Sequence, residues 1–151
     1  MKIKRFNFKK VNSTNRTAIK IIKNSKFDYG MVVSENQKNG KGQYGKKWIS
    51  YKGNLFVSLF YNIDNIDSSI KKLTRMNCLL VKKLISKFYK KEIFFKSPND
   101  LLINKKKISG ILQEIIIKDD KKYLIVGIGI NIVKSPNINK YPTTNLLEIV
   151  G

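Results

Sequence analysis

Histidine is absent from this sequence, and cysteine occurs only once, at Cys78. Without histidine, neither a Ser-His-Asp nor a Cys-His nucleophile pair can form, and the usual nitrogen and sulfur ligands of zinc are missing. A single cysteine also excludes a disulfide within the chain. Any catalysis must therefore rely on lysine, aspartate, asparagine, backbone amides and a bound ion.

Long apolar runs, repeats and linkers are missing as well. No stretch of about 18 uncharged apolar residues occurs, and no apolar run of signal-peptide length follows the basic start of the chain. The 151 residues contain three scattered prolines and no segment rich in glycine and serine. We therefore expect one domain, residues 1–151, in a soluble and cytoplasmic protein without a membrane partner.

Negative charge is scarce, because 31 Lys and Arg face 10 Asp and Glu, a formal net charge of +21. Such a balance suggests a nucleic-acid partner. However, only three of the cations are arginine, the better ligand for phosphate and guanine. Lysine, isoleucine and asparagine, all with A/T-rich codons, together supply 66 of the 151 residues. We favour base composition as the source of the lysine excess, with a selected anionic partner as the alternative.

Apolar periodicity predicts both helices and strands, and therefore an α+β fold. Between residues 13 and 24 the apolar positions share one helical face, which Ser13 or Thr14 can cap. Residues 66–89 repeat apolar positions at three and four, which predicts one long helix. Segment 53–61 is apolar on both faces, as in a strand covered on both sides. Further strands are expected at 3–11, 31–35, 92–95, 101–104, 106–117 and 122–133, with turns at 104–105 and 119–120. This order predicts a mixed, largely antiparallel sheet with helices on one side.

The stretch "SENQKNGKGQYGKKW", residues 34–48, spells two nucleotide-binding patterns at once. Its glycines fit the dinucleotide fingerprint G-x-G-x-x-G, and all but the last position of the Walker pattern G-x-x-x-x-G-K-[ST]. Both patterns need a helix directly afterwards, whereas here a glycine and a strand follow. Lys47 also stands where the Walker pattern has Ser or Thr. Two interpretations remain: a flexible loop, or a loop that becomes ordered on an anion held by its lysines.

Four segments occur in the order and spacing typical of biotin protein ligases: "STN" at 13–15, "GKGQYGKKW" at 40–48, "KSPNDLLINKKKISGILQE" at 96–114 and "VGIGINI" at 126–132. From Phe8 to about Leu147 the chain resembles this family. The resemblance implies the class II aminoacyl-tRNA-synthetase-like fold of biotin and lipoate ligase catalytic domains. It also implies ATP-dependent activation of biotin to biotinyl-5′-AMP. The acceptor would be a lysine of the biotin carboxyl carrier protein of acetyl-CoA carboxylase.

The resemblance also implies roles for single residues. Lys107 would contact the biotin carboxylate and the α-phosphate, Asp100 would lie near the incoming carrier lysine, and Lys96 would complete the catalytic set. The biotin site would comprise Ser13, Thr14, Asn15, Gln37, Gly110, Ile111 and Leu112. The nucleotide and adenylate site would comprise Gly40, Lys41, Gly42, Gln43, Gly45, Lys46, Trp48, Asn99 and Asn131. No direct metal motif is present, so Mg²⁺ would arrive with ATP.

Each of these residues also has a purely structural interpretation. Lys107 could be a surface lysine beside two others, "PND" a surface turn, "STN" a helix cap, and Gly127 and Gly129 the glycines of a strand bulge. The chain also departs from the family pattern. Gln43 replaces an arginine of the common "GRGRxGR" loop, which predicts leakage of reactive adenylate. Ser97 replaces the usual tryptophan of "KWPND", which weakens any stacking role there.

The architecture is expected to differ from that of many family members. We expect neither an N-terminal helix-turn-helix nor a C-terminal β-barrel, so gene regulation is not expected. A homodimer is compatible with the sequence. The alternatives are a lipoate or octanoate ligase of the same fold, a basic nucleic-acid-binding domain, and a ligase-like domain that binds biotin without turnover.

Overall fold

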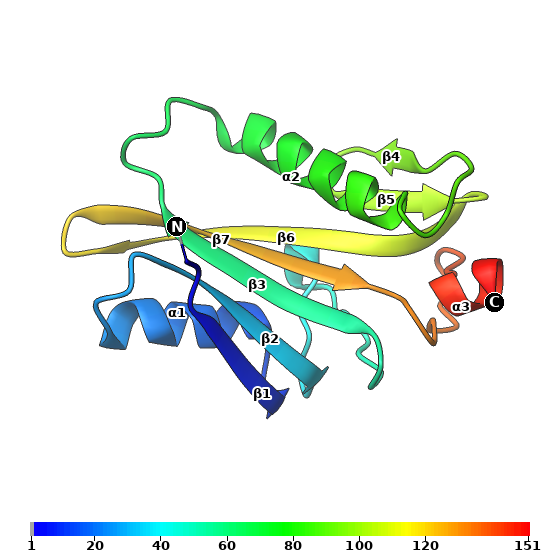
Figure 1. Ribbon diagram of the computed structural model, residues 1–151, viewed down its shortest axis with the longest axis horizontal. Helices are drawn as coiled ribbons and strands as arrows, with labels where there is room; N and C mark the ends of the chain where they lie inside the picture. Colours follow the sequence, from blue (N-terminus) through cyan, green and yellow to red (C-terminus); the bar gives the residue numbers. More distant parts are fainter. Residues whose placement is uncertain (1) are drawn as a thin grey trace.

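The computed structural model of the protein describes residues 2–151 and is organised around one seven-stranded sheet (Figure 1). The strands lie in the order β1-β2-β3-β7-β6-β5-β4. Only the β1–β2 pair is parallel, so the expected mixed and largely antiparallel sheet is confirmed. The elements are β1 (Arg5–Val11), α1 (Thr14–Asn24), β2 (Tyr29–Gln37), β3 (Leu55–Asn62), α2 (Ile70–Ile85), β4 (Phe94–Lys96), β5 (Asp100–Ile103), β6 (Lys106–Lys118), β7 (Lys121–Ile130) and α3 (Leu146–Val150).

The two long helices lie on opposite faces of the sheet, so the expectation of helices on one side is wrong (Figure 1). Along β7, Tyr123 and Ile125 pack in the cluster beneath α1, whereas Leu124 and Val126 pack in the cluster beneath α2. Successive strand residues point to opposite faces, so a strand that is apolar at every position needs cover on both sides. The same argument predicts that the strand in segment 53–61 is covered on both faces. The observed strand β3 is covered on both faces, as predicted.

The helix ends are set by serine caps. The Ser13 side chain accepts a hydrogen bond from the Arg16 amide, so Ser13 rather than Thr14 caps α1. Helix α2 is shorter than the predicted 66–89, because the Ser69 side chain caps it by accepting from the Lys72 amide. None of the helices within residues 2–151 is long and apolar enough to span a bilayer.

Both predicted hairpin turns are confirmed. Asn104 and Lys105 have φ values of 50° and 63°, and Asp119 and Asp120 have φ values of 49° and 62°. Two consecutive residues with positive φ give the type I′ geometry, which matches the twist of the flanking strands. Asparagine and aspartate tolerate this conformation better than most side chains do. The turns fix the β5–β6 and β6–β7 registers that bring the site residues together.

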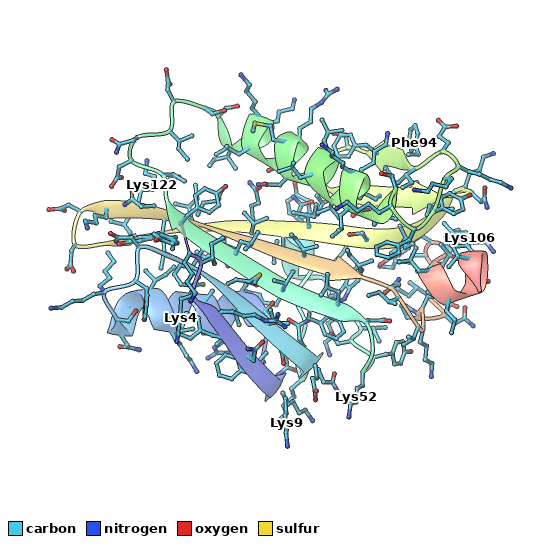
Figure 2. All side chains as sticks on the ribbon, viewed as in Figure 1. Lys4, Lys9, Lys52, Phe94, Lys106 and Lys122 are labelled. Atoms are coloured by element: carbon cyan, nitrogen blue, oxygen red, sulfur yellow. The ribbon has the colours of Figure 1, made fainter. Side chains whose placement is uncertain are left out.

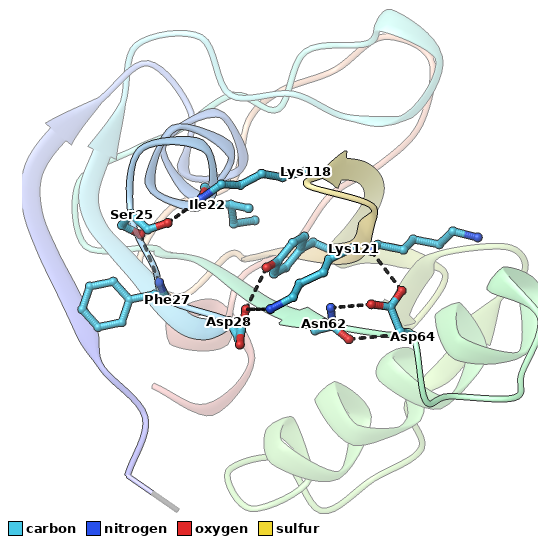
Figure 3. A network of polar contacts seen from close by, with 10 residues as sticks. Ile22, Ser25, Phe27, Asp28, Asn62, Asp64, Lys118 and Lys121 are labelled. Atoms are coloured by element: carbon cyan, nitrogen blue, oxygen red, sulfur yellow. Dashed lines mark hydrogen bonds and ion pairs between the residues drawn. The ribbon is translucent and has the colours of Figure 1, made fainter.

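Polar contacts hold the end of the β6–β7 hairpin against the rest of the molecule (Figure 3). The Lys118 ammonium donates to the carbonyl oxygens of Ile22 and Ser25, at 2.7 and 2.5 Å, where α1 ends. A cation at this end of a helix also complements the helix dipole. The Tyr123 hydroxyl donates to the Asp28 carboxylate at 2.7 Å. The hairpin, α1 and the start of β2 are therefore tied together at the end of the fold remote from α3.

Candidate functional site

A cavity of about 240 Å³ opens on the face of the sheet that carries α1. Most of the sequence-predicted site residues line it, although they come from five separate segments. These are Ser13, Thr14, Asn15, Gln37, Lys41, Gly42, Gln43, Lys46, Trp48, Lys96, Asn99, Asp100, Lys107, Gly110, Ile111 and Leu112. The fold thus gathers the predicted catalytic, biotin-binding and loop residues around one space.

Three predicted residues lie outside this lining. Gly40 is buried, and its carbonyl oxygen accepts from the Trp48 amide at 2.9 Å. A side chain at Gly40 would meet Gln37 Nε2 at 2.8 Å, so the position accepts only glycine without rearrangement. Gly45 has a φ of 72° in a loop turn, with open space around it. Asn131 lines a small adjoining hollow instead.

A buried polar cluster forms one wall of the cavity at the start of α1. The Gln37 side-chain oxygen accepts from the Thr14 amide at 2.9 Å and lies 3.2 Å from the Thr14 hydroxyl. The Ser58 hydroxyl lies 2.7 Å from Thr14 Oγ1 and 2.5 Å from Asn15 Oδ1. These bonds tie α1 to β2 and β3, so the helix start is held firmly beside the cavity.

The Asn15 amide is largely occupied within the protein. Its Nδ2 donates to the Leu112 carbonyl at 3.2 Å and to the Glu114 carboxylate at 3.0 Å, which leaves only oxygen lone-pair capacity for a ligand. Gly127 faces this amide, and a Cβ there would lie 2.9 Å from Asn15 Cγ. The absence of a side chain at Gly127 therefore makes room for Asn15, and no bulge is needed to explain this glycine.

The glycine-rich stretch folds as a small irregular hairpin over the cavity. Lys41 pairs with Lys47 across it, and the Gly42 amide donates to the Lys46 carbonyl at 2.7 Å. Its tip is a single turn at Gln43–Gly45, after which the chain runs extended into β3. No helix follows, as expected, so the geometry of a Walker loop or a dinucleotide fingerprint is not formed.

The Trp48 indole lies flat against two glycines that face each other across β6 and β7. Gly110 pairs with Gly129 in the sheet. A Cβ at Gly129 would lie 2.6 Å from Trp48 Cε2, and one at Gly110 would lie 3.1 Å from Cζ3. Any other side chain would displace the ring. The two glycines therefore let a loop residue form part of the cavity wall.

Lys107 projects into a cage of one carboxylate and two aromatic rings. Its Nζ lies 3.0 Å from Asp100 Oδ1, without the angles of a good hydrogen bond, so the contact is an ion pair. Nζ also lies 5.5 Å from the Trp48 ring and 5.2 Å from the Tyr141 ring. Burial, and then the nearby Asp100 carboxylate, raise the pKa of Tyr141, so its phenol is neutral at neutral pH.

The backbone of Lys107 is held as tightly as its ammonium. Its amide donates to the Pro142 carbonyl and its carbonyl accepts from the Thr144 amide, both at 2.9 Å. The C-terminal segment that carries Tyr141 is therefore attached directly to the start of β6. Asn99 fixes the other side, because its Nδ2 donates to the Ile111 carbonyl at 2.7 Å and its carbonyl accepts from the Ile111 amide.

Besides Asp100 Oδ1, which is ion-paired with Lys107, two buried polar atoms at the site have no hydrogen-bond partner among residues 2–151: Trp48 Nε1, a donor, and Asn131 Oδ1, an acceptor. Leaving such groups unpaired is costly, so a ligand that supplies partners gains affinity. Both residues line the small hollow that adjoins Lys107 and Tyr141. The side chains of residues 2–151 form no cluster of three or more His, Cys, Asp or Glu that could hold a metal ion.

Sequence reasoning missed several residues of the site. Ser58 is fully buried in an otherwise apolar strand, and this lone hydroxyl between Phe56 and Phe60 was the available signal. Tyr141 carried no signal, since its role depends on where the C-terminal segment returns to β6. Burial, followed by the charge of Asp100, raises the pKa of Cys78 to about 11, so this thiol stays protonated and is no nucleophile.

Comparison with known proteins identifies the class to which this fold and site belong. Residues 7–131 match the biotin/lipoate A/B protein ligase family. The chain therefore belongs to this family. Within it, the similarity includes the bifunctional ligase/repressor BirA of Bacillus subtilis, 33% identical over 129 residues, or 84% of this chain and 40% of that protein.

Solved structures agree with this assignment. The biotin protein ligase of Aquifex aeolicus in complex with biotin and ATP has a TM-score of 0.81 and 32% identity, over 97% of this chain and 61% of that chain. The Leishmania major enzyme in complex with biotin has a TM-score of 0.81 and 26% identity, over 95% of this chain and 63% of that chain. A lipoate protein ligase of Thermoplasma acidophilum, 14% identical with a TM-score of 0.60, shares the fold. The chain thus spans less than two thirds of the length of the Bacillus subtilis protein and of the two biotin protein ligases, and 77% of the lipoate protein ligase.

Proposed function

We propose that the chain activates biotin with ATP to form biotinyl-5′-AMP and then transfers biotin to a lysine of a biotin carboxyl carrier protein. In the first step a biotin carboxylate oxygen bonds to the α-phosphorus, and pyrophosphate leaves. In the second step the carrier lysine nitrogen bonds to the biotinyl carbonyl carbon, and AMP leaves. Neither step needs a nucleophile from the enzyme, so a protein without histidine is chemically adequate.

The observation that carries this proposal is the placement of the Lys107 ammonium in the same cavity as Thr14, Gln37 and Ile111. A cation there would offset the repulsion between two approaching anions and stabilise the charge that develops at phosphorus. The polar cluster at the start of α1 would meet the ureido ring of biotin, and the Leu112 side chain with the Ile111 backbone its apolar body. Relatives with biotin and ATP bound support the same ligands for this chain.

Magnesium would be carried by the triphosphate. Asp100 is the one acidic side chain among the residues that line the cavity, and it is already paired with Lys107. A single carboxylate is far from the six oxygen ligands that Mg²⁺ requires, which phosphate oxygens and water would complete. Lys41, Lys46 and Lys47 on the loop would add positive charge around the phosphates.

The alternative of a basic nucleic-acid-binding domain has little structural support. Figure 2 shows Lys4, Lys106 and Lys122 at separate places around the outline of the molecule, with Lys9 and Lys52 near each other at a fourth. A nucleic-acid site needs its cations gathered on one groove or face, with aromatic rings exposed among them. Scattered lysines instead fit a solvated surface.

The proposed function is tested by pyrophosphate release from the purified chain with Mg-ATP and biotin, compared with lipoate and octanoate. Addition of a biotin carrier domain then tests transfer. We expect release with biotin alone and biotinylation of the carrier lysine. Release with lipoate or octanoate would assign the chain to a different acyl donor. Biotin binding without turnover would point to a sensor or to a requirement for further protein segments.

Replacement of Lys107 tests the chemistry at the site. Lys107→Ala should lower biotin-dependent pyrophosphate release at least about 100-fold, the usual loss when one transition-state charge partner is removed. Its melting temperature should stay close to that of the parent protein. Lys106→Ala, which removes an exposed neighbour, is the matched control and should retain activity. Normal release by a folded Lys107→Ala protein would refute the role.

A further inference from the structure

We propose that Ser58 and Glu114 are positioning residues that fix which groups of the cavity wall donate hydrogen bonds and which accept them. This inference rests on the proposed function and extends it to ligand selectivity. Neither side chain lines the cavity, but both are bonded to residues that do. Together they hold the Thr14 hydroxyl as an acceptor, so the wall selects an acid whose head group presents an N–H.

The orientation of the Asn15 amide is set by two acceptors on β6. Leu112 and Glu114 are two residues apart on this strand, so both face α1. Asn15 Nδ2 lies 3.2 Å from the Leu112 carbonyl oxygen and 3.0 Å from the Glu114 carboxylate. The reversed amide would place Asn15 Oδ1 against two acceptor oxygens, which is repulsive. Asn15 Oδ1 therefore points to the other side, where β3 passes.

This amide orientation decides where the single hydroxyl proton of Ser58 goes. Ser58 Oγ lies 2.5 Å from Asn15 Oδ1 and 2.7 Å from Thr14 Oγ1. An amide oxygen is only an acceptor, so a contact this short requires the Ser58 proton between the two atoms. The Ser58 hydroxyl therefore donates to Asn15 and accepts from Thr14. Ser58 is fully buried, so bulk water does not compete for these bonds.

The hydroxyl proton of Thr14 is used inside the protein as well. Its acceptor is Ser58 Oγ at 2.7 Å or Gln37 Oε1 at 3.2 Å, which leaves the lone pairs of Thr14 Oγ1 for a ligand. Gln37 Oε1 accepts from the Thr14 amide at 2.9 Å, and Gln37 Nε2 donates one of its two protons to Ser50 Oγ at 3.1 Å. The wall therefore offers one acceptor, at Thr14, next to one remaining donor, at Gln37.

This pattern of one acceptor and one donor matches a cyclic urea, in which an N–H stands beside a carbonyl oxygen. A dithiolane ring or an alkyl chain has neither group. With such a head group, the Thr14 lone pairs and one Gln37 proton would stay unpaired in a largely buried wall, which is costly. Selectivity for biotin over lipoate or octanoate thus depends on Ser58 and Glu114, which the ligand does not contact.

The test compares equilibrium binding of biotin with that of two isosteric analogues, each with one ring N–H replaced by oxygen to give a cyclic carbamate. Isothermal titration calorimetry of the purified chain measures these affinities without ATP or turnover. For the parent protein we expect one carbamate to bind about 100-fold more weakly than biotin, because its ring oxygen meets the lone pairs of Thr14. Ser58→Ala frees the Thr14 hydroxyl to donate to that oxygen, so this affinity ratio should fall at least tenfold.

Substitutions on β6 separate hydrogen-bond polarity from packing. Glu114→Leu removes an acceptor that orients Asn15 and should lower the affinity ratio at least fivefold. Glu114→Gln keeps an acceptor oxygen and should hold the ratio within twofold of the parent value. Gln113→Leu is the matched control on the other face of the strand, where Gln113 bonds to Asn77 and Thr74. It should lower the melting temperature without changing the ratio. Circular dichroism melts establish that each variant is folded.

The outcomes distinguish this positioning role from the proposed function. If biotin binds, and folded Ser58→Ala and Glu114→Leu show the parent ratio, the positioning role is overturned while the proposed function stands. A ratio near one for both carbamates in the parent protein also overturns the role, since the wall then does not require an N–H. If biotin does not bind to the parent protein, the proposed function and the selectivity both fail.

Discussion

At the scale of single residues, most polar side chains of the site are fixed by partners within the protein. Asn15 uses both of its donors on Leu112 and Glu114, and Asn99 holds the Ile111 backbone from two sides. Such residues give the cavity its shape and cannot easily turn to follow a ligand. The loop cations Lys41, Lys46 and Lys47 form no ion pair among residues 2–151, so charge on the ligand determines which side chains move.

Gln43 gives a prediction at this scale. It lines the cavity at the tip of the loop, but its amide cannot make the paired, charge-assisted bonds that an arginine makes to phosphate. We expect the free adenylate to escape and label bystander lysines. Gln43→Arg should lower this labelling severalfold and preserve carrier labelling, as measured by mass spectrometry of a mixed lysate at equal turnover.

The matched control is Asn39→Arg, which adds the same charge at an exposed position outside the cavity lining and should not reduce bystander labelling. Strictly carrier-specific labelling by the parent protein would count against the prediction, as would equal labelling by Gln43→Arg.

Single residues also show how much of the site can be predicted from the sequence. Position and residue type were enough to predict that Lys107 and Asp100 belong to one site, because their family context is distinctive. The reason for Gly129 could not be derived, since the Trp48 ring that lies on it belongs to a loop about 80 residues earlier. Tyr141 is beyond sequence reasoning for the same reason: its contact with Lys107 exists only in the folded chain.

At the scale of elements, local chemistry predicts turns better than helix boundaries. Asn104, Asp119 and Asp120 are residue types suited to positive φ, and both turns occur where expected. The long periodic segment 66–89 overstated α2, because buried apolar residues such as Tyr89 lie in the turn that follows the helix. Periodicity detects burial, and it cannot distinguish a helix from an apolar turn packed on the same core.

The hairpin network of Figure 3 gives a prediction for pH dependence. Burial, and then the bond to Asp28, raise the pKa of Tyr123 to about 12 from an ordinary value near 10. The unfolded chain therefore releases this proton at a lower pH than the folded chain. The associated stability is fully present below about pH 10 and is lost as pH rises toward 12.

The comparison protein is Tyr123→Phe, which lacks the titrating group and the bond to Asp28. At pH 8 the parent protein should be more stable by about 1 kcal/mol, the usual net value of one hydrogen bond. This advantage should shrink between pH 10 and 12, as measured by urea unfolding. Tyr44→Phe, at a side chain that is 87% exposed, should leave the pH profile unchanged. A constant gap between parent and Tyr123→Phe would contradict the raised pKa.

At the scale of the whole molecule, the two faces of the sheet have different roles: one holds the main apolar core and the other holds the candidate site. The face beneath α2 holds the larger apolar core, and the face that carries α1 holds the cavity and its polar cluster. Because α2 does not line the cavity, the core can stay rigid while the loop and Lys107 respond to ligands. This division depends on which face each helix covers, and apolar periodicity alone does not specify the face.

The net charge of +21 gives the final prediction, because it acts on the molecule as a whole. Residues 2–151 contain two ion pairs, Lys107–Asp100 and Lys121–Asp28, so most lysines repel one another without a compensating partner. Added salt screens this repulsion, since the Debye length falls from about 10 Å at 0.1 M to 3 Å at 1 M. The melting temperature should therefore rise by several degrees between 20 and 500 mM NaCl. Lys9→Glu combined with Lys52→Glu, at two exposed lysines that line one hollow, should raise the low-salt value and weaken the salt dependence. A melting temperature that falls with salt would mean that attractive pairs outweigh repulsion, contrary to the charge distribution described above.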